Sequence, residues 1–200
     1  EGWSADYEAD VSAARAAVER AIELDPLLPA SYTMAGQIAL RFDRDFDRAV
    51  ALSTKGVELN INNAQGWWAL GRSLTASGMP GDGLRAFRQI QRLAPYAPPA
   101  MLFDMGQAYL LTGQVNEARG IFRYVLENSD DDRTPAQALL GLALIDAKNG
   151  REEDARGAVA SAMERDPRMS ARYLRADWVM RDEDVLERWL RTLRGLGLPK

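Results

Sequence analysis

Hydrophobic residues recur along the chain at the three- and four-residue spacing of amphipathic helices. In the first such segment, Val11, Val18 and Ile22 share one helical face. Glu23 lies on the opposite face, and Pro26 ends the pattern because a proline ring does not fit a helix interior. No stretch shows the sustained period-two alternation of a half-buried strand. The pattern therefore predicts an all-α chain.

The same periodicity predicts eleven helices separated by short breaks that carry Pro, Gly, Asn or Asp. The expected helices lie near residues 9–24, 30–42, 46–59, 64–77, 81–93, 99–112, 115–128, 134–149, 151–165, 169–180 and 183–195. The last helix has an apolar stripe formed by Val185, Leu186, Trp189, Leu190 and Leu193. Acidic residues begin it and arginines end it, which complements the helix dipole. We expect this helix to cap the fold.

Comparing the chain with itself reveals a repeat of two helices. A small residue opens each second helix, with successive spacings of 35, 34, 35 and 37 residues; these positions are Ala14, Ala49, Gly83, Ala118 and Ala155. The positions four residues later are Val18, Ser53, Phe87, Phe122 and Val159. The positions seven residues later are Ala21, Gly56, Ile90, Val125 and Ala162. A small residue also recurs in the first helices, as Gly36, Gly71, Gly106 and Ala143.

This pattern resembles the tetratricopeptide repeat (TPR), a helix–turn–helix unit of 34 residues. The third repeat carries the match best, through Trp67, Leu70, Gly71, Leu74, Phe87 and Pro95. The resemblance implies a right-handed α-solenoid of about five units with a C-terminal capping helix. We expect a single array over residues 1–200, with repeats at 1–28, 29–63, 64–97, 98–132 and 133–168 and capping helices within 169–200.

The segment Leu186–Pro199 is similar to the C-terminal signature of TPR regions in bacterial signalling proteins, where such a region follows a nucleotide cyclase or winged-helix domain. Gly2-Trp3, residues 45–49 and residues 59–62 look like other parts of the same regions. The resemblance implies a cytoplasmic regulatory region that lacks the effector domain. Because the chain begins at Glu1 and its first repeat has only its second helix complete, we expect an excised part of a longer protein.

The amino-acid composition excludes several classes of function. The chain has no Cys and no His, which excludes thiolate or imidazole catalysis and the commonest zinc sites. The 25 basic and 29 acidic residues give a net charge of −4, which argues against nucleic-acid binding by this region. No apolar run approaches the roughly 20 residues that span a bilayer. We therefore expect no enzyme in this fragment, no cofactor and no metal. The resemblance to TPR proteins implies a protein or peptide partner.

The TPR pattern implies that the first helices line a concave, partner-binding groove. The residues expected to face it are Thr33, Gln37, Arg41, Gln65, Trp68, Arg72, Phe103, Gln107, Leu110, Leu140, Leu144 and Lys148, with Arg175 and Trp178 extending the surface. Trp68 is informative because Trp67 already fills the structural position, and adjacent helical residues point roughly 100° apart. The Lys and Asn pattern that holds a peptide carboxylate in chaperone-binding TPR domains is absent. We therefore predict a peptide-binding groove with a mixed apolar and amide-rich lining.

Three alternatives stay open at this stage. In the first, Trp68 and Phe103 either pack against each other and close the groove or both contact a partner. The array binds another protein, or it makes the parent protein a homo-oligomer. The third alternative concerns the acidic residues Asp130, Asp131 and Asp132, which could hold a calcium ion or could solvate a loop and cap the helix that follows. Solvation and capping are the better interpretation.

Overall fold

The computed structural model describes residues 7–200, which form helices and connecting turns with no strand. The prediction that Gly2 and Trp3 begin the first repeat lies outside the described residues. Contacts along the chain group into two compact units, with the boundary between Pro95 and Tyr96. This boundary lies two residues before the predicted end of the third repeat at residue 97, and each unit is described separately below.

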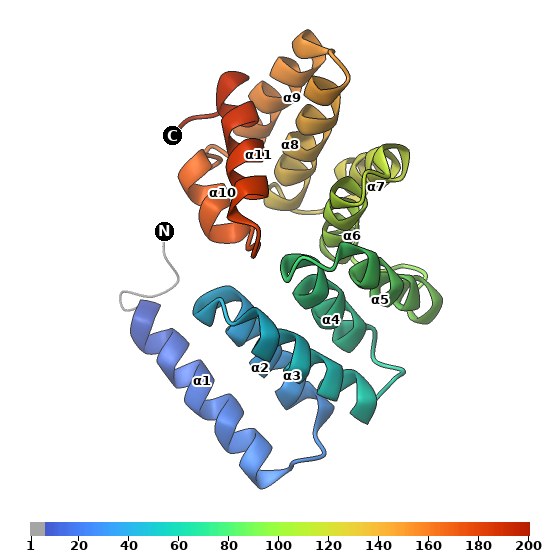
Figure 1. The fold of residues 1–200 in the computed structure, drawn as a ribbon, viewed down its shortest axis with the longest axis vertical. Coiled ribbons are helices and arrows are strands. Elements are labelled where there is room, and N and C mark those ends of the chain that lie inside the picture. Colours follow the sequence, from blue (N-terminus) through green and yellow to red (C-terminus); the bar gives the residue numbers. More distant parts are fainter. Residues whose placement is uncertain (1–6) are drawn as a thin grey trace. The chain divides into compact units, whose positions relative to one another are not determined.

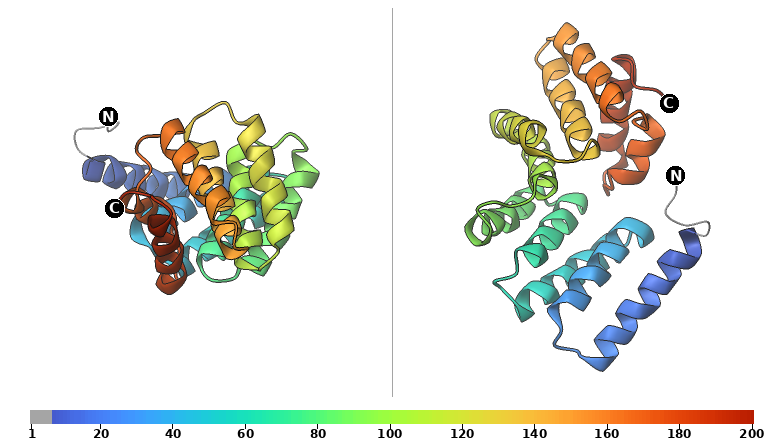
Figure 2. Two further views of the ribbon diagram at one scale, coloured as in Figure 1. Left: turned by 90° about the horizontal axis from the view of Figure 1, so that it is seen from above. Right: turned by 180° about the vertical axis from the view of Figure 1, so that it is seen from behind.

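Unit 1 consists of consecutive helices joined by short turns (Figures 1 and 2). They are α1 (Tyr7–Leu24), α2 (Pro29–Ile38), η1 (Ala39–Asp43), α3 (Phe46–Leu59), α4 (Ala64–Ala76) and α5 (Pro80–Leu93). The pairs α2–α3 and α4–α5 are helical hairpins, and α2 also packs beside α4. The predicted helix at 30–42 is therefore an α-helix that widens into a π-helical turn, η1.

Unit 2 contains two further hairpins and a C-terminal helix pair (Figure 1). Its helices are α6 (Pro99–Leu111), α7 (Val115–Asn128), α8 (Arg133–Lys148), α9 (Glu152–Arg165), α10 (Ala171–Asp177) and α11 (Glu183–Gly195). All eleven predicted helices are present, and α10 is shorter than expected. The fold class, an α-solenoid of helix–turn–helix units, is thus confirmed, while the description of the whole chain as one array stays a prediction.

Local sequence explains where the helices begin and turn. The Asp45 carboxylate accepts the Arg48 amide hydrogen at 3.0 Å and caps α3, and Asp182 caps α11 in the same way. The turns after α6 and α8 contain Gly113 and Gly150 with φ of 77° and 73°. Arg44 occupies the corresponding turn after η1 with φ of 51°, a left-handed conformation that costs a non-glycine residue about 1–2 kcal/mol.

Glycines in the first helices allow aromatic rings of the second helices to approach the backbone. A Cβ atom on Gly71 would lie 2.6 Å from the Phe87 ring, and one on Gly106 would lie 2.5 Å from the Phe122 ring. The opposite edge of Phe122 meets Gly141, where a Cβ atom would lie 2.6 Å away. Phe122 is therefore wedged between α6 and α8. The repeat alignment predicts the recurring first-helix residues but does not include Gly141, which stands two residues before the aligned Ala143.

The repeat positions in the second helices form the cores of the two units. Nearly inaccessible side chains at the aligned positions are Ala49, Ser53, Phe87, Ile90, Ala118, Phe122, Val125, Ala155, Val159 and Ala162. The predicted capping stripe of α11 is also buried at Leu186, Leu190 and Leu193, which join the core of unit 2. The aligned residues of α1 are the exception, since α1 buries none of its side chains.

Candidate partner-binding surface

Two adjacent tryptophans on α4 have different surroundings. Trp67 packs against the core residues Val57, Leu70 and Ala86, and its indole N–H donates to the Ile61 carbonyl at 2.8 Å. Trp68 is half-buried, and the Arg72 guanidinium lies over its ring, 5.0 Å from the centroid. This distance is typical of a cation–π contact. The structure therefore gives Trp67 the structural role, and Trp68 stacks with Arg72.

We define six accessible residues on the first helices of unit 1 as the first-helix surface. Its members are Met34, Gln37, Arg41, Gln65, Trp68 and Arg72. Arg41 and Gln65 are exposed, Met34 is 50% exposed, and the other three are half-buried. Met34 is not among the predicted groove residues, although it lies seven residues before Arg41 and so on the same helical face.

Thr33 does not belong to this surface, which corrects its prediction as a groove residue. Its side chain is only 4% exposed, and its hydroxyl donates to the Pro29 carbonyl at 3.1 Å. The hydroxyl oxygen also lies 2.8 Å from where a Cβ atom on Gly56 would stand. Thr33 is thus enclosed where α2 and α3 approach closely, and a partner has no access to it.

Three predicted groove residues of unit 2 are also buried. Phe103 packs on Phe122, with 5.8 Å between ring centroids, and Leu140 and Leu144 belong to the same core. Leu140 and Leu144 lie on α8, which is packed by α11 and linked to α10 through Asp177. These helices bury the α8 face that the TPR pattern assigns to the groove. The prediction of Phe103, Leu140 and Leu144 as partner contacts is therefore wrong for this structure.

Arg175 and Trp178, the two residues predicted to extend the groove surface, differ in exposure. Trp178 is 3% exposed and makes an edge-to-face contact with Trp189, so it is a core residue. Arg175 is exposed and forms an ion pair with Glu187. Among the remaining predicted residues, Gln107 and Leu110 are half-buried and Lys148 is exposed. Unit 2 therefore offers a partner fewer of the predicted side chains than unit 1.

The strongest electrostatic feature of unit 2 is an arginine pair around Asp146, which is 7% exposed. The Arg119 guanidinium donates to its carboxylate at 2.6 Å, and Arg151 donates through Nε at 2.9 Å. Burial raises the pKa of Asp146, but the hydrogen bonds from the two arginines outweigh this effect and leave the pKa below its usual value. The contacts connect α7, α8 and the start of α9, which is a structural role.

A second charged cluster connects α8 to α10. Asp177 pairs with Arg133 and accepts a hydrogen bond from the Gln137 amide at 2.6 Å. Burial lowers the pKa of Arg133, but the charge of Asp177 and its hydrogen bond raise it above the usual value. The pKa of Tyr173 is raised, first by burial and then by the negative charge of Asp177. These groups satisfy one another, as expected of a structural network.

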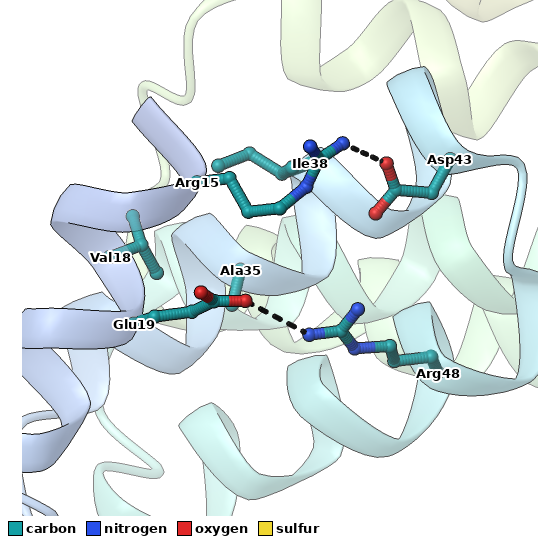
Figure 3. Close-up of a pocket in the computed structure, with 7 residues that line it drawn as sticks. All are labelled: Arg15, Val18, Glu19, Ala35, Ile38, Asp43 and Arg48. Atoms are coloured by element: carbon teal, nitrogen blue, oxygen red, sulfur yellow. Dashed lines mark hydrogen bonds and ion pairs between the residues drawn. The ribbon is translucent and has the colours of Figure 1, made fainter. Parts of the chain in front are cut away.

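A small pocket in unit 1 lies beside α1 (Figure 3). Arg15 and Glu19 of α1 extend over it and pair with Asp43 of η1 and Arg48 of α3, respectively. The pocket has a volume of about 220 Å³, including space open to solvent. Ligand pockets usually have volumes of about 300–1,000 Å³ and apolar walls. This pocket is better described as the place where ion pairs attach α1 to η1 and α3.

The acidic cluster before α8 caps that helix. The Asp131 carboxylate accepts the Thr134 amide hydrogen at 2.7 Å, as the capping interpretation predicts. No group of three acidic side chains that could hold a metal ion occurs within residues 7–200. No helix in this range is long and apolar enough to cross a membrane.

Solved structures resemble this chain over most of its length. A type IV pilus biogenesis factor, PilW, matches with a TM-score of 0.71 at 17% identity, covering 93% of this chain and 84% of that one. A TPR protein of Thermus thermophilus matches with a TM-score of 0.66 at 19% identity, covering 92% and 91%. YrrB, a TPR protein described as having an unusual peptide-binding site, matches with a TM-score of 0.60 at 17% identity, covering 90% and 92%. At these identities the likeness shows the fold.

No curated protein matches the sequence. The model of the tetratricopeptide repeat family matches residues 68–133 and 103–170, which together span more than half of the chain. The matched segments contain the α4–α5, α6–α7 and α8–α9 hairpins or parts of them, with the small and aromatic repeat positions described above. The chain belongs to the tetratricopeptide repeat family.

Proposed function

We propose that this chain is a protein–protein interaction module that binds a peptide segment of its partner on the first-helix surface of unit 1. The stacked pair of Trp68 and Arg72 carries the proposal. Trp and Arg are the side chains most often found at the energetic centres of protein interfaces. TPR proteins generally mediate protein–protein interactions, and a structural neighbour is described as having a peptide-binding site.

The chemistry of the surface favours a peptide with apolar and amide groups. Met34 and Trp68 offer apolar contact area, while Gln37 and Gln65 offer carboxamides that both donate and accept hydrogen bonds. Such carboxamides suit the alternating N–H and C=O groups of a peptide backbone. Arg41 adds an exposed cation at one edge. Gln107, Leu110, Lys148 and Arg175 of unit 2 stay predicted partner contacts.

Selection of random twelve-residue peptides on immobilised protein would test this function. We expect the selected peptides to bind the wild-type chain saturably, and we expect the double variant Trp68→Ala with Arg72→Ala to weaken binding at least tenfold. The matched control is Tyr124→Ala with Arg88→Ala, which removes an exposed aromatic and an exposed arginine elsewhere. Wild-type affinity in the double variant, or an equal loss in the control, would remove the first-helix surface as the binding site.

We further propose that the module is a non-catalytic, regulatory part of a larger bacterial signalling protein of the cytoplasm. The similarity of Leu186–Pro199 to the ends of TPR regions that follow a cyclase or winged-helix domain supports this context. Light scattering of the isolated chain tests the competing self-association role. A stable dimer at low micromolar concentration would favour self-association over peptide binding.

A further inference from the structure

The charge of α5 differs from that of the other second helices. Helix α5 carries three arginines, Arg85, Arg88 and Arg92, and a single acidic residue, Asp82. The second helices α3 and α7 each carry two acidic and two basic residues, and α1 and α9 each carry four acidic and two basic residues. Helix α5 is therefore a basic element in a chain whose net charge is −4.

The repeat alignment shows that two of these arginines replace other residue types at equivalent positions. Nine residues after the small residue that opens each second helix, the chain has Glu23, Glu58, Arg92, Glu127 and Glu164. Two residues after the same small residue, it has Ala16, Ala51, Arg85, Gly120 and Gly157. All of these residues are exposed. Because the other second helices form without a cation at either position, the fold does not require one there.

The three arginines form one ridge along the exposed side of α5. At about 100° per residue they lie within roughly 60° of arc and over about 10 Å of helix length. The opposite side of α5 contains Phe87 and is buried. Asp82 forms an ion pair with Arg85, whereas Arg88 and Arg92 form none within the part of the chain that the structure describes. We call Arg85, Arg88 and Arg92 the arginine ridge.

Packing and helix stability do not account for the arginine ridge. Arg92 lies in the last turn of α5, where a cation complements the helix dipole, but Arg85 and Arg88 lie outside that turn. Arg88 and Arg92 are four residues apart, and like charges at this spacing destabilise a helix. The ridge is also not a gap left by a missing repeat. Its equivalent positions in α7 are exposed although one complete hairpin precedes α6–α7 and another follows it.

We propose that the arginine ridge binds an Asp- and Glu-rich peptide segment of a partner protein. Guanidinium groups bind carboxylates through paired N–H donors, which makes arginine well suited to carboxylate recognition. Arg88 and Arg92 have no acidic partner among the described residues, so their charge is complemented only by such a ligand. The ridge lies on a second helix, whereas the first-helix surface lies on α2 and α4. The two surfaces therefore bind different peptides.

The surroundings of the ridge favour an acidic peptide over other polyanions. Single-stranded nucleic acid is usually held by stacking aromatic rings as well as by cations, and the one aromatic residue of α5, Phe87, is 1% exposed. Helices that bind a membrane surface bury apolar side chains in it, and α5 exposes no large apolar side chain. The net charge of −4 also opposes binding to an extended polyanion.

Fluorescence anisotropy with a labelled peptide of six glutamates tests the ridge. We expect saturable binding to the full chain at low ionic strength, weaker binding as salt is added, and no saturable binding of a peptide of six glutamines. Arg88→Glu with Arg92→Glu should weaken binding at least tenfold. The matched control is Arg165→Glu with Arg191→Glu, which changes the net charge equally at two exposed arginines of unit 2 and should keep the wild-type affinity. Circular dichroism would check that both variants keep their helices.

Three results would overturn this inference. The first is absence of saturable hexaglutamate binding, and the second is an equal loss in the ridge and control variants, since binding would then follow net charge alone. The third is tighter binding of oligothymidine or of anionic phospholipid vesicles that the ridge variant abolishes, which would replace the peptide with another polyanion.

The two proposed surfaces fail independently. Trp68→Ala with Arg72→Ala should leave hexaglutamate binding unchanged while it weakens binding of peptides to the first-helix surface. Tyr124→Ala with Arg88→Ala should have the converse effect, because Arg88 belongs to the arginine ridge.

Discussion

Units 1 and 2 are built from the same hairpin but differ in how they cover their first helices. In unit 1, α2 and α4 keep Met34, Gln37 and Trp68 accessible or half-buried. In unit 2, the equivalent face of α8 is closed by the C-terminal helices, and Leu140 and Leu144 become core residues. A repeat position therefore fixes the direction of a side chain, whereas the neighbouring helix decides whether a partner can reach it.

The units also differ in the ion pairs that join their helices. In unit 1, α1 is attached through Arg15–Asp43 and Arg48–Glu19, and three of these four side chains are at least 38% exposed. Exposed pairs contribute about 0–1 kcal/mol. In unit 2, the Asp146 carboxylate is nearly buried between two arginines. We therefore expect α1 to open more readily than the helices around Asp146, and the following variants test this contrast.

The largest difference in stability loss is expected between the variants Phe122→Ala in unit 2 and Trp68→Ala in unit 1. Removing the Phe122 ring leaves a cavity between Gly106 and Gly141, and we expect a loss of about 3–5 kcal/mol in the stability of unit 2. Trp68→Ala removes a half-buried ring and should cost unit 1 no more than about 1 kcal/mol. Urea unfolding followed by hydrogen exchange would resolve the units. Equal losses would show that the first-helix surface of unit 1 is as structural as the unit 2 core.

Replacing the alanine that opens a second helix with leucine should reduce stability much more in α9 than in α1. Ala155 is fully buried, so Ala155→Leu should overpack the α8–α9 contact and cost about 1–3 kcal/mol. Ala14 occupies the same position in α1 but is exposed, so Ala14→Leu should change stability by less than about 0.5 kcal/mol. Thermal unfolding of both variants measures this. A large loss in Ala14→Leu would mean that α1 is packed on that face.

Asp146→Asn should destabilise unit 2 by about 1–3 kcal/mol, because an amide replaces the carboxylate that receives both arginines. The folded-state pKa of Asp146 lies below its ordinary value of 3.8, so its stabilising contribution is present above that pH and is lost as pH falls through the folded pKa. The variant should therefore show a flatter decline of unit 2 stability below about pH 4. An unchanged acid-induced decline in Asp146→Asn would contradict this role of the Asp146 carboxylate in unit 2.

The smallest effect concerns the turns. Arg44 holds the left-handed conformation that Gly113 and Gly150 adopt in unit 2. Arg44→Gly should stabilise unit 1 by about 1 kcal/mol, since glycine adopts this conformation without a Cβ penalty. Gly113→Ala should destabilise unit 2 by a similar amount. If Arg44→Gly lowers the melting temperature, contacts of the Arg44 side chain outweigh the backbone strain.

The sequence predicted local structure well because helix periodicity and capping are short-range effects. The positions of Pro26, Asp45 and Gly113 mark helix ends, and the structure places ends beside each of them. The candidate surface was predicted less well. The TPR pattern pointed to Trp68 and Arg72, and the adjacent Trp67 strengthened the case for Trp68. Met34 was missed because a single methionine on a helix gives no sign of its exposure.

What the sequence determined by itself is the hairpin: its helices, its small and aromatic contact positions, and its membership of the repeat family. Only the tertiary structure decided which faces remain open, since Leu144 is covered by helices that follow α9 along the chain and Ala14 lacks the cover that Ala155 has. The physical reason is that periodicity specifies the direction of a side chain about its own helix. Burial depends on a second helix, which a local pattern does not encode.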